Sequence, residues 1–141
     1  MGKGSIPFSG TKLGVKHLAQ HVTVFPSVAR TASHNSQDFS NSDFAKSSGI
    51  GAVITIDCTA DPASASVVFT VQGKDPTSGK YYTILASAAI AATGTTTLRV
   101  HPDLTAAANT VAKDMMPAVW RVAAVHADGD SITYSVGASI V

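Results

Sequence analysis

Glutamate is absent from this chain of 141 residues, and all nine acidic residues are aspartate. Cysteine occurs once, at Cys58, which excludes an internal disulfide and a cysteine-rich zinc site. Only 13% of the residues are charged and 45% are hydrophobic, a balance too apolar for a disordered chain. There is no apolar run of roughly 18 residues and no apolar stretch typical of a signal peptide, so we expect folding in a cytoplasm without membrane contact.

Alanine, serine and threonine together make up more than a third of the residues. A chain of this length is expected to form one domain with a real core. A core that contains many alanines brings sheets or subunits close together but buries less apolar area than one built from leucine and phenylalanine. This composition favours completion of the fold by oligomerisation.

The charges are divided unevenly along the chain. Residues 1–48 carry a formal charge of about +3, and the remainder carries about −2 by simple counting. We expect the basic part to contact an acidic surface, including that of another copy of the protein. The positive charge is too small and too scattered for a nucleic-acid-binding protein.

Residues 1–48 are predicted to form an extended N-terminal arm and linker, because serine, asparagine, glycine and threonine are frequent there. The best strand candidate in this part is His21–Phe25, which Pro26 is expected to end because proline donates no backbone hydrogen bond. Phe39 and Phe44 are the large apolar residues of the serine-rich linker, and we expect them to attach the linker to the body.

Residues 49–141 are predicted to form the body, an all-β single sandwich of about six or seven strands. Apolar and polar residues alternate there in short segments separated by turn residues. An immunoglobulin-like and a jelly-roll topology both fit this spacing. Trp120 is expected at the centre of the core. The predicted strands are 52–58, 66–73, 81–86, 95–101, 118–126 and 131–137.

Three connections in the body have recognisable sequences. Residues 74–80 contain Pro76 and Gly79 and predict a hairpin loop. The pair Asp128-Gly129 predicts a second hairpin between the last two strands. The alanines of residues 104–116 favour a loop with a short helix.

The sequence contains no recognisable catalytic, cofactor or metal motif, so an enzyme is not expected. His17 and His21 have a spacing that would suit a metal on a helix, but the neighbouring valines favour extended structure. Cys58 lies on the predicted core face, which indicates a buried structural thiol. Asp128 and Asp130 are interpreted as turn residues rather than calcium ligands.

Binding surfaces remain as the candidate functional features. Pro76, Tyr81 and Tyr82 are possible contact residues at one end of the sandwich, although either tyrosine could equally cover a sheet face. In the arm, the apolar residues Phe8, Val22, Val24 and Phe25 are the candidate anchors for a partner.

Four segments of the body resemble small structural proteins encoded by tailed bacteriophages and prophages: Phe69–Ala86, Thr95–Pro102, Trp120–Val122 and Ser131–Gly137. The resemblance covers roughly residues 50–141 and does not include the arm. It implies a virion component, assembled in the host bacterial cytoplasm, and it carries no catalytic residues.

Together, these observations lead us to expect a capsid decoration (cement) protein. Its partners would be the major capsid protein and further copies of itself, arranged as a homotrimer, with no direct contact to nucleic acid. A tail-tube, neck or fibre-associated virion protein is one alternative. A carbohydrate-binding module that aids adsorption to the host is another, and an exposed tryptophan or tyrosine on a concave face would favour it.

Overall fold

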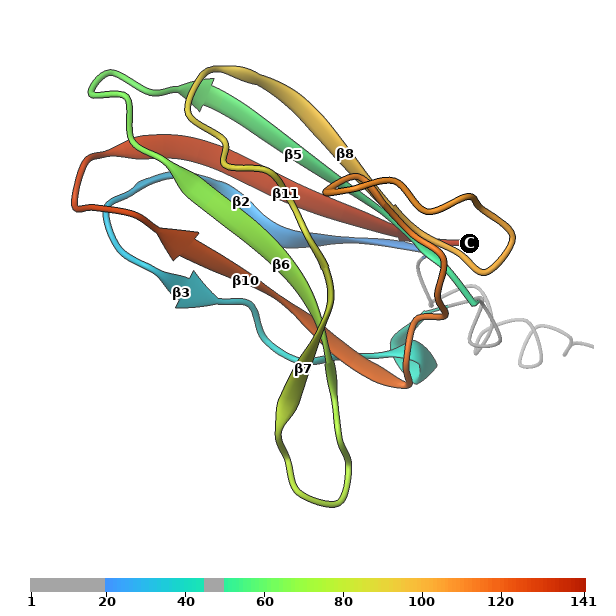
Figure 1. Ribbon diagram of the computed structural model, residues 1–141. Helices are drawn as coiled ribbons and strands as arrows, with labels where there is room; N and C mark the ends of the chain where they lie inside the picture. Colours follow the sequence, from blue (N-terminus) through green and yellow to red (C-terminus); the bar gives the residue numbers. More distant parts are fainter. Residues whose placement is uncertain (1–19, 45–49) are drawn as a thin grey trace, which may run out of the picture.

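Two β-sheets pack face to face in the computed structural model, which describes residues 20–44 and 50–141 (Figure 1). The prediction of an all-β sandwich is confirmed. The elements are β2 (His21–Arg30), β3 (His34–Asn35), β4 (Phe39–Ser40), a 3₁₀ turn η2 (Asn41–Asp43), β5 (Ala52–Ala60), β6 (Val67–Lys74), β7 (Tyr81–Ala86), β8 (Gly94–Val100), β9 (Val111–Ala112), β10 (Val119–His126) and β11 (Ile132–Ile140).

The strand order identifies the sandwich as a jelly roll. One sheet has the order β2-β11-β5-β8-β9, and the other has the order β3-β10-β6-β7, with β4 also paired to β10. When β3 and β4 are counted as one interrupted strand and the short β9 is left out, the eight strands form nested pairs: first with last, second with seventh, third with sixth, and fourth with fifth. Successive pairs alternate between the sheets. In a constant-type immunoglobulin sandwich, by contrast, the first and last strands belong to different sheets.

Residues 20–44 are part of the sandwich, so the predicted boundary between arm and body at residue 48 is wrong for them. Strand β2 pairs with β11 over almost its whole length, and β3 and β4 pair with β10. Phe39 and Phe44 are buried against Trp120, which confirms that they attach this segment to the core. The rest of the predicted arm that precedes β2, residues 1–19, lies outside the described residues.

Strand β2 does not end at Pro26 as predicted but continues to Arg30. The strand lies at the edge of its sheet, where a missing N–H is tolerated because one side of the strand has no ladder. The pairing of β11 with β2 shifts register between Tyr134 and Val136, close to the proline. Pro26 therefore does not end the strand, because β2 is an edge strand.

The connection through Asp128 and Gly129 is not a hairpin, which corrects a second prediction. Strand β10 pairs with β6 and β3, whereas β11 pairs with β2 and β5, so the turn passes from one sheet to the other. The predicted hairpin between β6 and β7 is confirmed. The short helix predicted within residues 104–116 is wrong: this connection consists of turns and of β9, which runs parallel to β8.

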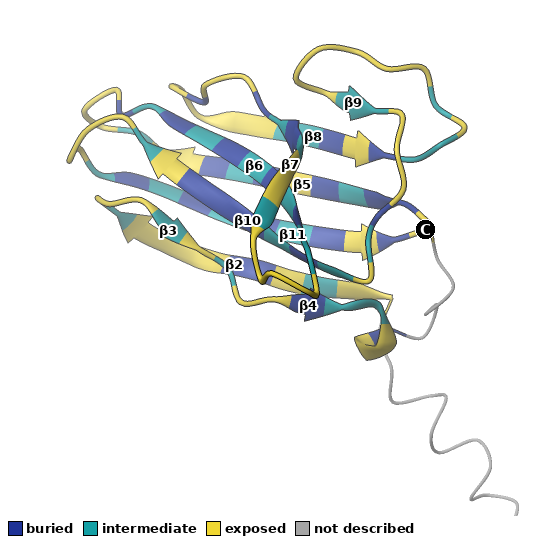
Figure 2. Cartoon of the chain, turned by 60° about the horizontal axis from the view of Figure 1, so that its bottom comes forward, coloured by how far each residue is buried: buried dark blue, intermediate teal, exposed yellow. Residues whose placement is uncertain are grey.

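The core lies between the sheets, where buried and exposed residues alternate along the strands (Figure 2). Trp120 and Tyr134 are its largest fully buried side chains, which confirms the predicted central place of the tryptophan. The edge of the Phe69 ring meets Tyr134 with ring centroids 4.9 Å apart. Aromatic side chains thus contribute much of the apolar area in a core whose other residues are mostly isoleucine, valine, alanine and leucine.

Candidate functional site

One end of the sandwich carries the surface features that are most suited to binding. The β6–β7 hairpin begins beside the start of β10, since Gly73 pairs with Trp120. The connection between β8 and β10 ends there too, where the Met116 N–H donates to the Ile50 carbonyl and the Ile50 N–H donates to the Val141 carbonyl. In Figure 1 the hairpin extends away from the C-terminus. Strand β2 also begins at this end, because the carbonyl of Gln20, the residue before it, accepts a hydrogen bond from the Ile140 N–H. We call this region the hairpin end.

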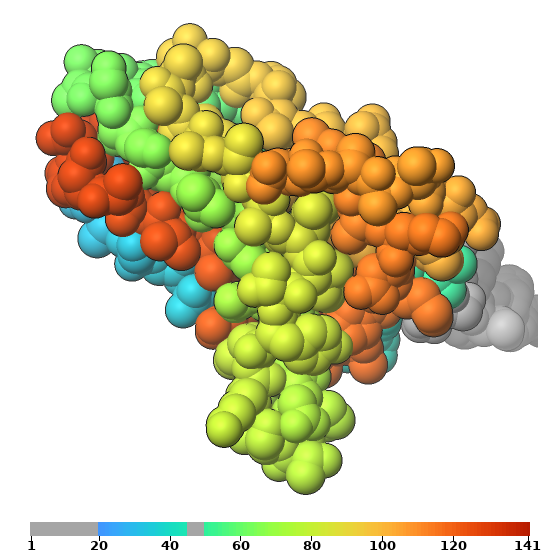
Figure 3. Space-filling view, in the orientation of Figure 1, coloured from blue at the N-terminus to red at the C-terminus, as the bar shows by residue number. Residues whose placement is uncertain are grey.

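The β6–β7 hairpin projects well beyond the rest of the molecule (Figure 3). Its loop is closed by a hydrogen bond from the Asp75 N–H to the Lys80 carbonyl, and Gly79 supplies the positive φ of 75° that the turn requires. The Ser78 hydroxyl and the Thr77 N–H donate to the Asp75 carboxylate, which lowers the pKa of Asp75. The loop therefore has a defined conformation although Pro76 is exposed.

A polar cluster fixes the base of this hairpin to the sheet. The Tyr81 hydroxyl donates to the Asp38 carboxylate, and the Lys74 ammonium group lies 3.0 Å from the same carboxylate. The Arg121 guanidinium lies 3.4 Å from the centre of the Tyr81 ring, and its Nε donates to Gln72. The hydrogen bonds from Tyr81 and Lys74 lower the pKa of Asp38. Tyr81 thus covers the sheet face, which was the alternative left open for it.

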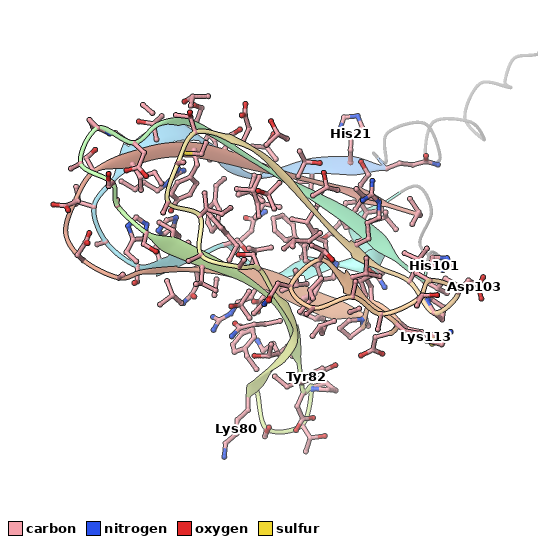
Figure 4. The ribbon with its side chains drawn as sticks, turned by 45° about the horizontal axis from the view of Figure 1, so that its top comes forward. His21, Lys80, Tyr82, His101, Asp103 and Lys113 are labelled. Atoms are coloured by element: carbon pink, nitrogen blue, oxygen red, sulfur yellow. The ribbon has the colours of Figure 1, made fainter. Side chains whose placement is uncertain are left out.

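Tyr82 is the exposed tyrosine of the hairpin, with 48% of its surface accessible. Its ring lies against the backbone of Gly73, where an added Cβ would come within 2.4 Å of the ring carbon Cζ. Glycine at position 73 therefore allows the ring to lie flat on β6 while its other face stays in solvent. Figure 4 shows Tyr82 and Lys80 on the projecting hairpin, away from the body.

Apolar side chains are concentrated at the hairpin end. Six large hydrophobic residues are at least 37% exposed among the described residues, and four of them, Ile50, Tyr82, Met115 and Val141, belong to this end. Backbone hydrogen bonds connect Ile50 to Val141 and to Met116, so Ile50, Val141 and the adjacent Met115 are neighbours on a fixed backbone, whereas Tyr82 lies on the projecting hairpin. An apolar surface of this kind, with polar residues around it, is typical of an interaction site.

An apolar cleft of about 280 Å³ opens beside Val141. Its lining comes from the start of β5, the end of β8 and the following turn: Ala52, Val53, Arg99, Val100, His101, Asp103, Leu104 and Val141. The His101 ring packs closely on Gly51, where a Cβ would lie 2.7 Å from ring carbon Cδ2. Lys113 donates to the Pro102 carbonyl and so holds the turn that forms one wall. Figure 4 shows His101, Asp103 and Lys113 grouped together, apart from Tyr82 and Lys80 on the hairpin.

The structure brings together some of the predicted contact residues and separates others. Pro76, Tyr81 and Tyr82 all belong to the hairpin, as predicted. Val24 and Phe25 are buried in the core, and Val22 packs against the core, so these three residues are not arm anchors. They face inward because β2 is a strand of the sandwich. Phe8 lies outside the described residues.

Sequence reasoning missed the cleft and the exposed Met115. Both depend on the long connection between β8 and β10, whose alanines and turn residues form no recognisable pattern. The predicted strand 95–101 corresponds to β8, which ends at Val100, and His101 and Asp103 in the turn after it also line the cleft.

Catalytic chemistry receives no positive support from the described residues. Within residues 20–44 and 50–141, no three histidine, cysteine or aspartate side chains are arranged as metal ligands. Cys58 is buried, and burial raises the pKa of its thiol. In the same ranges, the one helical turn, Asn41–Asp43, is too short to cross a membrane.

No protein-family model and no curated protein sequence matches the chain. The functional interpretation therefore rests on the molecule itself.

A second group of titratable side chains lies where the edge strands of the two sheets meet. We call His34, His126, Tyr134 and Arg30 the seam cluster. The Tyr134 hydroxyl is hydrogen-bonded to His126 Nε2 at 2.9 Å, and the His34 ring stacks on Tyr134. The Arg30 guanidinium lies 4.7 Å from the Tyr134 ring centre and donates to the Tyr134 carbonyl. Burial raises the pKa of Tyr134 to about 12.

The seam cluster disfavours positive charge on His126. Burial is the main cause that lowers the pKa of His126, and the nearby His34 and Arg30 lower it further. Asp128 acts weakly in the opposite direction. His34 Nε2 and His126 Nδ1 are buried and have no hydrogen-bond partner among the described residues. The fold therefore favours the neutral imidazole.

We expect the protein to lose thermal stability as the pH falls from 7.5 to 5. A histidine whose folded pKa lies below its unfolded value of 6.5 stabilises the fold fully only above that value, since the unfolded chain binds the proton more readily. The melting temperature should be a few degrees lower at pH 5 than at pH 7.5, and His126→Gln should make this decrease smaller. Asp38 and Asp75 do not contribute in this range because their pKa values are lowered.

His21→Gln serves as the matched control because His21 is exposed at the start of β2. Melting curves at the two pH values should show the wild-type pH dependence for this variant. An unchanged pH dependence in His126→Gln would show that His126 is not the group responsible.

Proposed function

We propose that this protein is a structural protein of a tailed-phage virion that decorates the head shell and stabilises it. The observation that carries the proposal is the concentration of three features at the hairpin end: a projecting hairpin, four exposed apolar side chains, and the point where residues 1–19 join the sandwich. Jelly rolls also form viral capsid domains, which supports the proposal by analogy of fold alone.

The hairpin end would bind through preorganised contacts. The cluster around Asp38 and Tyr81 holds the hairpin in place before a partner arrives, so little conformational entropy is lost on binding. Tyr82 and Met115 would bury apolar area against the shell. Residues 1–19 carry three lysines and no acidic residue, and they would add contacts that weaken at high salt.

The partner would be the major capsid protein, and neighbouring copies of this chain would contact each other around a symmetry axis as a homotrimer. Each copy would contribute a modest interface. Many copies on one shell would together resist the pressure of packaged DNA, because binding sites that are linked within a lattice gain avidity.

The test is binding of the purified protein to phage shells that lack it. Tyr82→Ser and Met115→Ser together should weaken binding by about tenfold or more, because exposed aromatic and apolar anchors dominate such interfaces. Val125→Ser is the matched control, since Val125 is 52% exposed but lies at the other end of β10. Equal binding by the double variant and the control would overturn the proposed interface.

Carbohydrate binding is a second candidate because Tyr82 offers one accessible ring face beside Lys80 on an exposed loop. Jelly rolls also form lectin domains. Specific binding of the isolated protein to a glycan array, lost in Tyr82→Ser, would favour an adsorption module. The other alternative from the sequence is a tail-tube, neck or fibre-associated protein. The location of the protein in the particle, on the head or on the tail, distinguishes it from the proposed function.

A further inference from the structure

The cleft beside Val141 is a preformed apolar site at the surface of the hairpin end. Ala52, Val53, Val100, Leu104 and Val141 are the apolar residues of its lining. Its volume of about 280 Å³ exceeds the roughly 150 Å³ of an engineered protein cavity that accepts benzene, so a phenyl ring fits within it. We propose that this cleft binds Ile6, Pro7 and Phe8 of the same chain.

The location of the cleft favours this occupant. Residues 1–19 join the sandwich at Gln20, whose carbonyl accepts a hydrogen bond from the Ile140 N–H at 2.8 Å. The next residue, Val141, is part of the cleft lining. The segment therefore begins directly beside the site that it would occupy.

The length of the segment permits the contact. Eleven residues lie between Phe8 and Gln20, and the chain between these two residues can span up to about 40 Å. Gly10 and Gly14 allow the reversal that a return to the cleft requires. The cost of closing such a short loop is small, and the tether gives an effective concentration in the millimolar range. These terms favour the segment of the same chain over that of a second copy.

The chemistry of the segment matches the cleft. Ile6, Pro7 and Phe8 are three consecutive apolar residues, and Pro7 restricts Ile6 to extended conformations that present side chains to a groove. Lys3 and Lys12 flank the triplet, while the Asp103 side chain at the rim is 88% exposed and free to meet a cation. Phe8 thereby acquires a specific binding site within its own chain.

This contact would act as a latch on the N-terminal segment. The free protein would hold residues 1–19 at the hairpin end, and a partner that binds the segment would first have to displace Phe8 from the cleft. The inference concerns the free protein and does not depend on the capsid function proposed above, so its test contains no shell.

Paramagnetic NMR tests the latch in the full-length protein. A nitroxide on Ser5→Cys should strongly reduce the amide signals of Val100, Leu104 and Val141, while Cys58 is buried and stays unlabelled. Phe8→Ser should restore these signals, whereas Val15→Ser should not. Leu104→Ser should restore the signals of Val100 and Val141 by altering the cleft itself.

A mixed sample distinguishes the alternatives. Spin-labelled protein without ¹⁵N is combined with unlabelled ¹⁵N protein, and the cleft signals should keep their intensity. Loss of the cleft signals in the mixed sample would show that the segment binds a second copy and would overturn the proposal. Unreduced cleft signals in both samples would overturn it as well.

Discussion

A variant that lacks residues 1–30 should fail to fold, whereas a variant that lacks residues 1–19 should keep the sandwich. The first deletion removes β2 completely and exposes the edge of β11, with which it pairs from His21 to Arg30. It also removes Val24 and Phe25 from the core. The second deletion leaves every strand of the described sandwich intact.

The contacts of Phe25 explain the size of the expected effect. Its ring lies 4.5 Å from the His34 ring and 6.3 Å from the Tyr134 ring, between the two sheets. Loss of one buried phenylalanine side chain alone typically costs about 3–5 kcal/mol. Together with the loss of the β2–β11 pairing, this destabilisation exceeds the free energy of unfolding of a domain at the lower end of the typical range of about 5–15 kcal/mol.

Circular dichroism and urea unfolding of both deletion variants check this prediction. The variant lacking residues 1–19 should show a cooperative transition within about 2 kcal/mol of the full chain, since an exposed latch contributes little. A cooperative transition in the variant lacking residues 1–30 would contradict the assignment of β2 to the sandwich. The shorter deletion is therefore the correct tool for testing an arm in shell binding.

Phe44→Ala should destabilise the protein by about 3–5 kcal/mol, as expected for truncation of a buried aromatic residue. Phe44 is 2% exposed, and its ring stacks on Trp120 with centroids 6.3 Å apart. The capped turn that precedes it, closed by Ser40 and Asp43, fixes its approach to the core. Substitution leaves a cavity beside Trp120 that the β10 backbone cannot close.

Urea unfolding measures this loss, with the midpoint lowered and the slope unchanged if the denatured state is unaffected. Gln37→Ala is the control in the same segment, because Gln37 is exposed and should change stability by no more than about 0.5 kcal/mol. If both variants unfold at the same urea concentration as the wild type, residues 32–44 are not anchored to the core as described.

Local sequence patterns predicted most of the strands but not how they pair. The alternation of Ile54, Ile56 and Cys58 with polar residues marks a strand with one buried face, and the burial pattern of β5 confirms it. The Asp128-Gly129 pair marks a tight turn, but a turn sequence does not specify whether the next strand joins the same sheet. The inward faces of β10 and β11 instead meet across the core.

The assignment of residues 20–44 failed for a related reason. Serine and asparagine indicated a linker, yet two of the serine hydroxyl groups accept hydrogen bonds from β10: Ser36 Oγ accepts from the Val122 N–H, and Ser33 Oγ accepts from the His126 N–H. Polar composition does not distinguish a free linker from a segment at the edge of a sheet whose side chains accept hydrogen bonds from the backbone of the neighbouring strand.

The candidate site was predicted in part. Pro76 and Gly79 define a loop from sequence alone, which placed Tyr81 and Tyr82 at one end of the sandwich. The different roles of the two tyrosines follow from residues distant in sequence, Asp38 and Arg121, which only the folded chain brings to Tyr81. The cleft combines β5, β8 and Val141 and has no local sequence signal.

We propose that this jelly roll binds a protein lattice through its hairpin end. The hairpin is held by a network at its base, and the exposed apolar residues lie beside it. The seam cluster lies elsewhere, between β2 and β3, and bears on stability rather than on binding. Function and acid sensitivity should therefore be separable by mutation.

Electron cryomicroscopy of the phage particle would show directly where the protein lies and how it is oriented. We expect density for the jelly roll in many symmetry-related copies on the outside of the head shell, with the β6–β7 hairpin and Tyr82 directed toward the capsid protein. Density for the jelly roll confined to the tail, or a copy on the shell with its hairpin end directed into solvent, would contradict this expectation.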